Sequence, residues 1–141
     1  MTPDEIRAFL LTGTRTGKVA VTRRDGAPLV VPIWFLLDDD GTVVFTTGEK
    51  TVKGRALRRD SRLSMCVDED APPYAYVRVD GRAELSDHAG DLLRWATAIG
   101  ARYMGADRGD DFGRRNAVPG ELLVRVRPTR VVGLAEIAAE P

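Results

Sequence analysis

Strand-like segments follow one another along this chain with only short turns between them. Asp25–Gly26 and Asp38–Gly41 lie at two of the junctions, and Asp-Gly sequences between apolar runs are typical of β-hairpins. Parallel strands would need a crossover helix between each pair, whereas these connections favour antiparallel neighbours, with the first three strands in meander order. We therefore predict a mainly β fold, a closed or nearly closed antiparallel barrel of six to seven strands with flanking α-helices. The expected strands cover residues 18–22, 28–37, 42–47, 62–69, 74–85 and 121–137.

Two short helices are expected beside these strands. The first covers residues 2–11, where Thr2 is a candidate N-cap, Pro3 stands in the first turn and two acids follow. This is the usual chemistry of a helix start. The second runs from about Thr51 to Arg59 and interrupts the series of strands.

A longer helix is predicted from about Ser86 to Met104, because its apolar residues recur at helical spacing. Either Ser86 or Asp87 is a candidate N-cap. The segment 105–120 is polar and rich in glycine and is predicted to be a loop, and Pro128 is expected to divide or bulge the last strand. The apolar face of the long helix consists of Leu92, Trp95, Ala96, Ile99 and Tyr103.

The bulk composition excludes several classes of protein. A chain of 141 residues is predicted to form one domain, residues 1–141. Lys+Arg and Asp+Glu are 21 each, so no overall basic field exists to hold nucleic acid. The single cysteine, Cys66, provides neither a disulfide framework nor a metal-binding cluster, which favours a reducing cytoplasm. No export signal and no apolar run of about 18 residues is present, which argues against a membrane protein.

Positive charge gathers at the corner between the third strand and the short helix. This stretch holds two of the chain's three lysines, Lys50 and Lys53, although the rest of the chain uses arginine almost exclusively. If Thr51 caps the helix, Lys53 and Arg55 fall near its positive end, where a cation costs up to about 1 kcal/mol. Gly54 in the same turn costs roughly another 1 kcal/mol relative to alanine.

A bound anion would remove this conflict. Backbone N–H groups at the helix start, the threonine hydroxyls and the cations would all be available to it, and Gly48 and Gly54 would let the backbone approach closely. A phosphate group is the anion that the pattern favours. The alternative, which the residues alone leave open, is that both lysines are solvated side chains on a surface turn.

Three segments, residues 27–70, 74–85 and 126–134, together resemble a known family. They are similar to the split β-barrel flavin and deazaflavin oxidoreductases, the pyridoxamine 5'-phosphate oxidase-like superfamily, and within it to the actinobacterial branch that uses coenzyme F420. The resemblance extends from about Lys18 to Leu134. It implies a homodimer whose two barrels pack side by side, with a cofactor groove at each end of the interface built from both subunits.

The resemblance also implies where a cofactor would lie. Its ring would contact Pro32, Ile33 and Trp34 on the second strand. Its phosphate would lie at the corner after the third strand, held by Thr46, Thr47, Lys50, Lys53 and Arg55, and Thr51 at the same corner completes the expected cofactor-binding set.

The second strand bears on which cofactor is bound. FMN-binding relatives commonly carry an arginine there, in a pattern like R-x-x-x-L-K, whereas this strand reads PLVVPIWFLL and has no charge. Its P-x-x-P-x-W-F pattern resembles the deazaflavin branch. The implied activity is that of an F420-dependent reductase, which transfers a hydride between the C5 of the deazaflavin and a small conjugated substrate, quinone-like or biliverdin-like.

Two alternatives to this reductase stay open. One is an FMN-dependent enzyme of the pyridoxamine 5'-phosphate oxidase type, and the other is a non-catalytic carrier of coenzyme F420. No catalytic side chain and no metal ligand is assigned. For Trp34, ring contact and core packing are equally favoured. His88 is expected at the surface, and Trp95 and Tyr103 in the core or a dimer interface.

Overall fold

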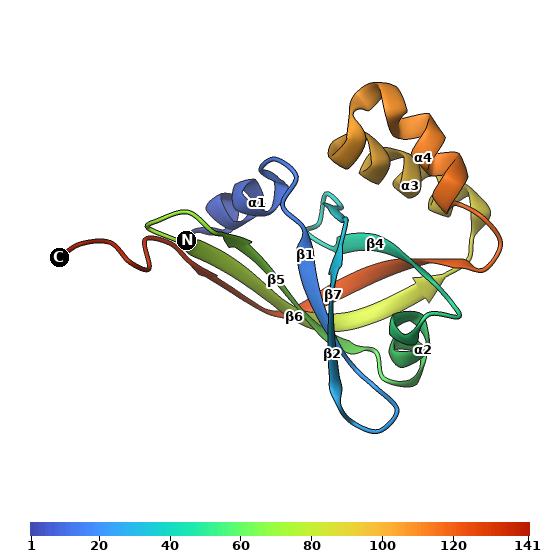
Figure 1. The fold of residues 1–141 in the computed structure, drawn as a ribbon, viewed down its shortest axis with the longest axis horizontal. Helices are drawn as coiled ribbons and strands as arrows, with labels where there is room; N and C mark the ends of the chain where they lie inside the picture. The colour runs from blue at the N-terminus through green and yellow to red at the C-terminus, as the bar shows by residue number, and fades with distance from the viewer.

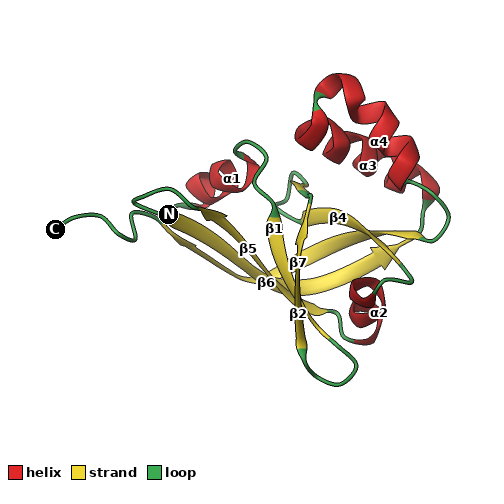
Figure 2. Cartoon of the chain, viewed as in Figure 1, coloured by secondary structure: helices red, strands yellow, loops and turns green.

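The computed structural model describes all residues of the chain, 1–141. Seven strands build one antiparallel sheet, and four α-helices and a short 3-10 helix lie around it (Figure 1, Figure 2). The strands are β1 (Gly17–Thr22), β2 (Pro28–Ile33), β3 (Leu36–Leu37), β4 (Val43–Gly48), β5 (Arg62–Glu69), β6 (Ala75–Ser86) and β7 (Glu121–Leu134). The helices are α1 (Pro3–Leu11), α2 (Val52–Arg59), α3 (Ala89–Met104), η1 (Ala106–Arg108) and α4 (Gly109–Asn116).

The order of the strands explains how the sheet curls into a barrel. It is β2-β1-β5-β6-β7-β4-β3, so β2 and β3 lie at opposite edges. Only Trp34 and Phe35 separate these two strands in the sequence, so the chain passes directly from one edge of the sheet to the other and brings the edges together. This arrangement confirms the prediction of a mainly β, split antiparallel barrel.

The predicted single strand over residues 28–37 is wrong, because the chain breaks into β2 and β3. The pairings of the predicted meander are nevertheless confirmed, because β2 pairs with β1 and β3 pairs with β4, while the other edge of β4 pairs with β7. At the break, side chains of α3 take over the hydrogen bonds of the backbone. The Phe35 N–H donates to the Tyr103 hydroxyl (3.3 Å), and the Phe35 carbonyl accepts from Arg102 Nη1 (2.7 Å).

The main core fills the barrel, and a smaller one lies under α3. Phe35, Phe45 and Val124 are fully buried members of the main core. The smaller cluster consists of Val44, Leu92, Trp95 and Leu123. Trp95 is 7% exposed, which confirms its predicted burial.

The predicted N-caps of the first two helices are confirmed. Thr2 caps α1 in a capping box with Glu5, and Thr51 caps α2 through a hydrogen bond from the Gly54 N–H (3.0 Å). The predicted cap of α3 is wrong. Its N-cap is the exposed His88, whose Nδ1 accepts from the Asp91 N–H (3.1 Å).

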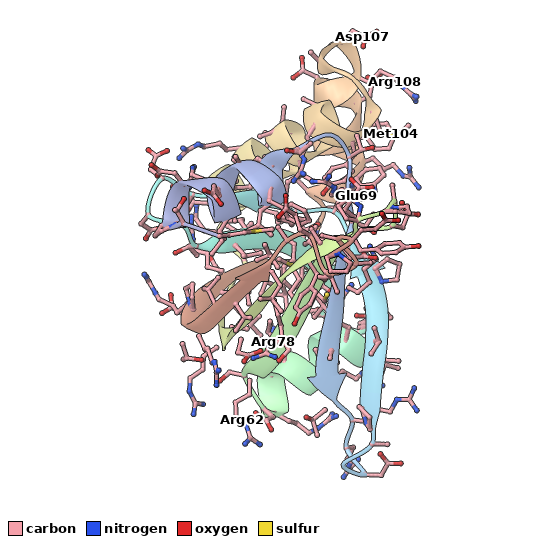
Figure 3. The ribbon with its side chains drawn as sticks, turned by 90° about the vertical axis from the view of Figure 1, so that its left-hand side faces the viewer. Arg62, Glu69, Arg78, Met104, Asp107 and Arg108 are labelled. Carbon is pink, nitrogen blue, oxygen red and sulfur yellow. The ribbon has the colours of Figure 1, made fainter.

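The prediction of a loop over residues 105–120 is also wrong, because this segment contains η1 and α4 folded back against α3. Its glycines make the close helix packing possible: a Cβ on Gly113 would overlap the Thr97 hydroxyl, and one on Gly109 would lie 3.1 Å from the Thr97 carbonyl oxygen. Figure 3 shows Asp107 and Arg108 at the outer end of this helical hairpin, at the opposite end of the molecule from Arg62.

The last strand is continuous but irregular, as Pro128 predicted. The β6–β7 register shifts between Asp80 and Gly81, where Gly81 faces Pro128. Gly81 leaves room for this irregularity, since a Cβ there would lie 2.5 Å from the Arg127 carbonyl oxygen. None of the helices combines the length and the apolar character that crossing a membrane requires.

Candidate functional site

A cavity of about 280 Å³ lies between the strand ends and the α3–α4 hairpin. We call it the central pocket. Strands β2, β4 and β7 and helices α2, α3 and α4 all contribute side chains, so it forms only in the folded chain. Five of the nine predicted cofactor-binding residues line it, namely Pro32, Ile33, Trp34, Thr46 and Lys53, together with Ala96, Ile99, Asn116 and Glu121.

The uncharged wall of the central pocket ends in Trp34, which neighbouring aromatic rings hold in place. The Trp34 ring stacks on Tyr103 with centroids 5.2 Å apart and planes at 3°, and meets Phe112 edge-on at 5.7 Å. Trp34 therefore both packs against the helices and lines the pocket. One face of its ring is taken by Tyr103, so any ligand contact must use the remainder.

Tyr103 fixes this wall through its hydroxyl group. The hydroxyl accepts from the Phe35 N–H and donates to the Arg15 carbonyl (2.8 Å). Burial raises the pKa of Tyr103, although the hydrogen bond at Phe35 and the charge of Arg102 oppose the shift. The predicted packing role of Tyr103 is thus confirmed, and it ties α3 to the break between β2 and β3.

The charged side of the central pocket consists of Lys53 and Glu121, both half-buried. Burial lowers the pKa of Lys53, and the Glu121 carboxylate opposes this shift. Burial also raises the pKa of Glu121, while the Thr46 hydroxyl and the Lys53 ammonium act in the opposite direction. Each group is therefore the main counter-charge of the other inside the pocket.

Thr47 and Thr51 form the frame of the corner. The Thr51 hydroxyl donates to the Gly48 carbonyl (2.7 Å) and accepts from the Gly54 N–H. The hydroxyl of the buried Thr47 lies 3.4 Å from that of Thr51. These contacts occupy the Thr51 hydroxyl in capping the helix.

Gly54 has a packing role at the same corner. A Cβ at this position would overlap the Gly48 carbonyl oxygen. The expectation that Gly54 leaves room for a ligand is therefore corrected: it leaves room for the strand end, which allows α2 to start so close to β4.

The three predicted cations of the corner do not converge. Lys50 lines a neighbouring hollow that it shares with Glu49 and Glu121, whereas Lys53 lines the central pocket. Arg55 lies on the outer side of α2, in a third hollow with Arg23, Arg24, Asp25, Val52 and Arg59. Only Lys53 among the three faces the uncharged wall of β2.

Glu121 is the charged residue of the pocket that the sequence did not indicate, and the polar Asn116 was not predicted there either. Glu121 lies far from Lys53 in the sequence, at the first position of β7, and the β4–β7 register pairs it with Gly48. Its carboxylate partly relieves the unfavourable placement of Lys53 at the positive end of α2. In the sequence, the only indication is an acidic residue directly after the Pro119–Gly120 turn. The pairing of β7 with β4 is what brings this residue to the pocket.

Comparisons with known proteins agree with this architecture. Residues 2–135 match the family model described as pyridoxamine 5'-phosphate oxidase. A conserved hypothetical protein from Mycobacterium tuberculosis is 26% identical, with a TM-score of 0.84 over 96% of this chain and 86% of that chain. A structure named F420 reductase is 25% identical, with a TM-score of 0.70 over 93% of this chain and 98% of the other.

The fold is also found in a protein whose name refers to heme storage. The heme storage protein HutZ from Vibrio cholerae is 17% identical, with a TM-score of 0.71 over 92% of each chain, a likeness that concerns the fold alone. No curated protein matches the sequence. Because the family model covers nearly the whole chain and the observed barrel agrees with it, the protein belongs to the pyridoxamine 5'-phosphate oxidase family.

Proposed function

We propose that this protein is an F420-dependent oxidoreductase that transfers a hydride between coenzyme F420 and a small conjugated organic substrate. The observation that carries the proposal is the central pocket, where the uncharged wall of β2 faces a single half-buried lysine. The likeness to an F420 reductase, at 25% identity, supports the same cofactor.

The residues of the central pocket fit the chemistry of such a cofactor. Pro32, Ile33 and Trp34 offer an apolar surface for a flat ring, and Lys53 offers a cation for a phosphate, while Thr46 lines the pocket beside it. Bound coenzyme F420 would supply the hydride from its C5 carbon. The protein's part is to position the ring, exclude water from one side and hold the phosphate.

The size of the pocket supports a site completed by a second copy of the chain. Its volume of about 280 Å³ is slightly below the usual range of small-molecule sites, which begins near 300 Å³. It has room for part of such a cofactor. We therefore include in the proposal the homodimer that the resemblance implies, with both subunits contributing to each groove.

The second candidate is an FMN-dependent enzyme, which the family match favours. The absence of any charge over residues 28–37 weighs against it, because no cation of β2 is available to the FMN phosphate. Lys53 would have to balance a doubly charged phosphomonoester while Glu121 stands beside it.

Parallel titrations with coenzyme F420 and FMN, followed by fluorescence, test the proposal. We expect saturable binding of coenzyme F420 and, with the reduced cofactor under anaerobic conditions, turnover of a quinone or biliverdin. Tight binding without turnover over a broad acceptor panel would indicate a carrier. Preferential retention of FMN would favour the second candidate, and binding of neither cofactor would refute both.

A further inference from the structure

Glu121 places a negative side chain in a pocket that is proposed to bind an anion. It lines both the central pocket with Lys53 and the neighbouring hollow with Lys50, and the charge of Lys53 acts on its carboxylate. Any phosphate bound by Lys53 must therefore lie near a negative side chain. Arg55, the third cation of the corner, lines neither the central pocket nor the neighbouring hollow.

The charges along the central pocket sum to zero when both Lys53 and Glu121 are ionised. A singly charged ligand group can still be held there by the Lys53 ammonium, because its repulsion from one carboxylate is limited. A doubly charged group experiences twice the repulsion from Glu121, since the Coulomb energy scales with the charge of the ligand. The attraction to Lys53 doubles in the same way, so it is the Glu121 carboxylate that weakens binding of a doubly charged group more than binding of a singly charged one.

We propose that Glu121 is a specificity-determining residue that favours a cofactor with a singly charged phosphodiester over one with a doubly charged phosphomonoester. The inference rests on the proposed function and names the reason for its cofactor preference. The phosphate of coenzyme F420 is a diester that joins the ribityl chain to the oligoglutamate-bearing tail. The phosphate of FMN is a terminal monoester whose second pKa is about 6.

The test is the change in cofactor preference caused by Glu121→Gln, which removes the charge and keeps the shape. Dissociation constants for coenzyme F420 and FMN are measured at pH 8, where the monoester is doubly charged. If the substitution strengthens diester binding by about threefold, we expect it to strengthen monoester binding by about tenfold, because the removed repulsion doubles with the charge. The preference for coenzyme F420 should therefore narrow about threefold.

Two controls separate the phosphate from the rest of the molecule. Riboflavin and the corresponding phosphate-free deazaflavin should bind the wild type and the variant with unchanged affinities. Glu49→Gln removes an equal charge from the neighbouring hollow, where Glu49 pairs with Arg58 (3.5 Å), and should leave the cofactor preference unchanged.

The possible results distinguish this inference from the proposed function. Wild-type binding of coenzyme F420 with the same preference in the Glu121→Gln variant would overturn the role of Glu121 and leave the reductase proposal standing. An equal shift in Glu49→Gln would also overturn it, since the effect would then be the general charge of the surface. Failure of the wild type to bind coenzyme F420 would overturn the proposed function and the inference together.

Discussion

Replacement of Lys53 by alanine tests the central pocket as the phosphate site. Lys53 is the single cation among the residues that line this pocket, and burial lowers its pKa. Because the side chain is half-buried, water can replace only part of the contact between Lys53 and a bound phosphate. A charge-assisted hydrogen bond contributes about 1.5 to 3 kcal/mol, which corresponds to roughly a ten- to 150-fold weaker dissociation constant for coenzyme F420.

The fold should tolerate this change. A cation in the first turn of α2 lies at the positive end of the helix dipole, so its removal relieves a repulsion of a few tenths of a kcal/mol. The Glu121 carboxyl loses its counter-charge, and we expect its pKa to rise further. Thermal unfolding of the variant should therefore resemble that of the wild type, which separates lost binding from lost structure.

Lys50→Ala is the matched control, because it removes an exposed lysine from the same corner but from a different hollow. An exposed charge contributes up to about 1 kcal/mol, so its effect on affinity should stay below about fivefold. The measurement is the dissociation constant of each variant for coenzyme F420, obtained by fluorescence titration. Equal losses in the two variants, or an unchanged constant for Lys53→Ala, would refute the assignment of the phosphate to the central pocket.

Three further predictions concern the frame of the site. Gly113→Ala should lower the free energy of unfolding in urea by about 1 to 3 kcal/mol, because its Cβ overlaps the Thr97 hydroxyl; unchanged stability would mean that α4 is free to move away. Thr51→Ala should cost about 1 kcal/mol in the same assay through loss of the N-cap of α2. Thr51→Ser keeps the capping hydroxyl and should retain the stability of the wild type. The folded chain raises the pKa of Glu121 above the ordinary value of a glutamate carboxyl, 4.5, so the folded state binds this proton more tightly than the unfolded state. The contribution of Glu121 to stability should then fall as pH rises above 4.5, and Glu121→Gln should remove that part of the pH dependence; identical pH profiles would contradict it.

The misassigned segment 105–120 shows why local rules failed there. Glycine lowers helix propensity and favours loops, so Gly109 and Gly113 indicated an irregular segment. In the folded chain both are helical because they face Thr97 and Ala101 on α3, where any larger side chain would prevent the close approach. Propensity is a property of a single segment, whereas this packing depends on two.

At the candidate site, too, some features were predicted from the sequence and others depend on packing between segments. The expected wall of Pro32, Ile33 and Trp34 does line a pocket together with Thr46 and Lys53. The sequence did not indicate that Lys50 and Arg55 would face other hollows, because their directions depend on how α2 packs against β4. It also did not indicate Glu121, whose place depends on the pairing of β7 with β4.

By itself, the sequence determined the class of fold, most of the strands, the caps of α1 and α2 and the presence of two lysines at the corner after β4. These features follow from interactions over a few residues, such as alternation of apolar side chains, turn chemistry and helix capping. Only the tertiary structure decided that residues 28–37 divide between opposite edges of the sheet, that α4 folds onto α3, and that Glu121 stands beside Lys53. Each of these depends on contacts between distant segments, because strand register and helix packing are settled only when the whole chain closes around its core.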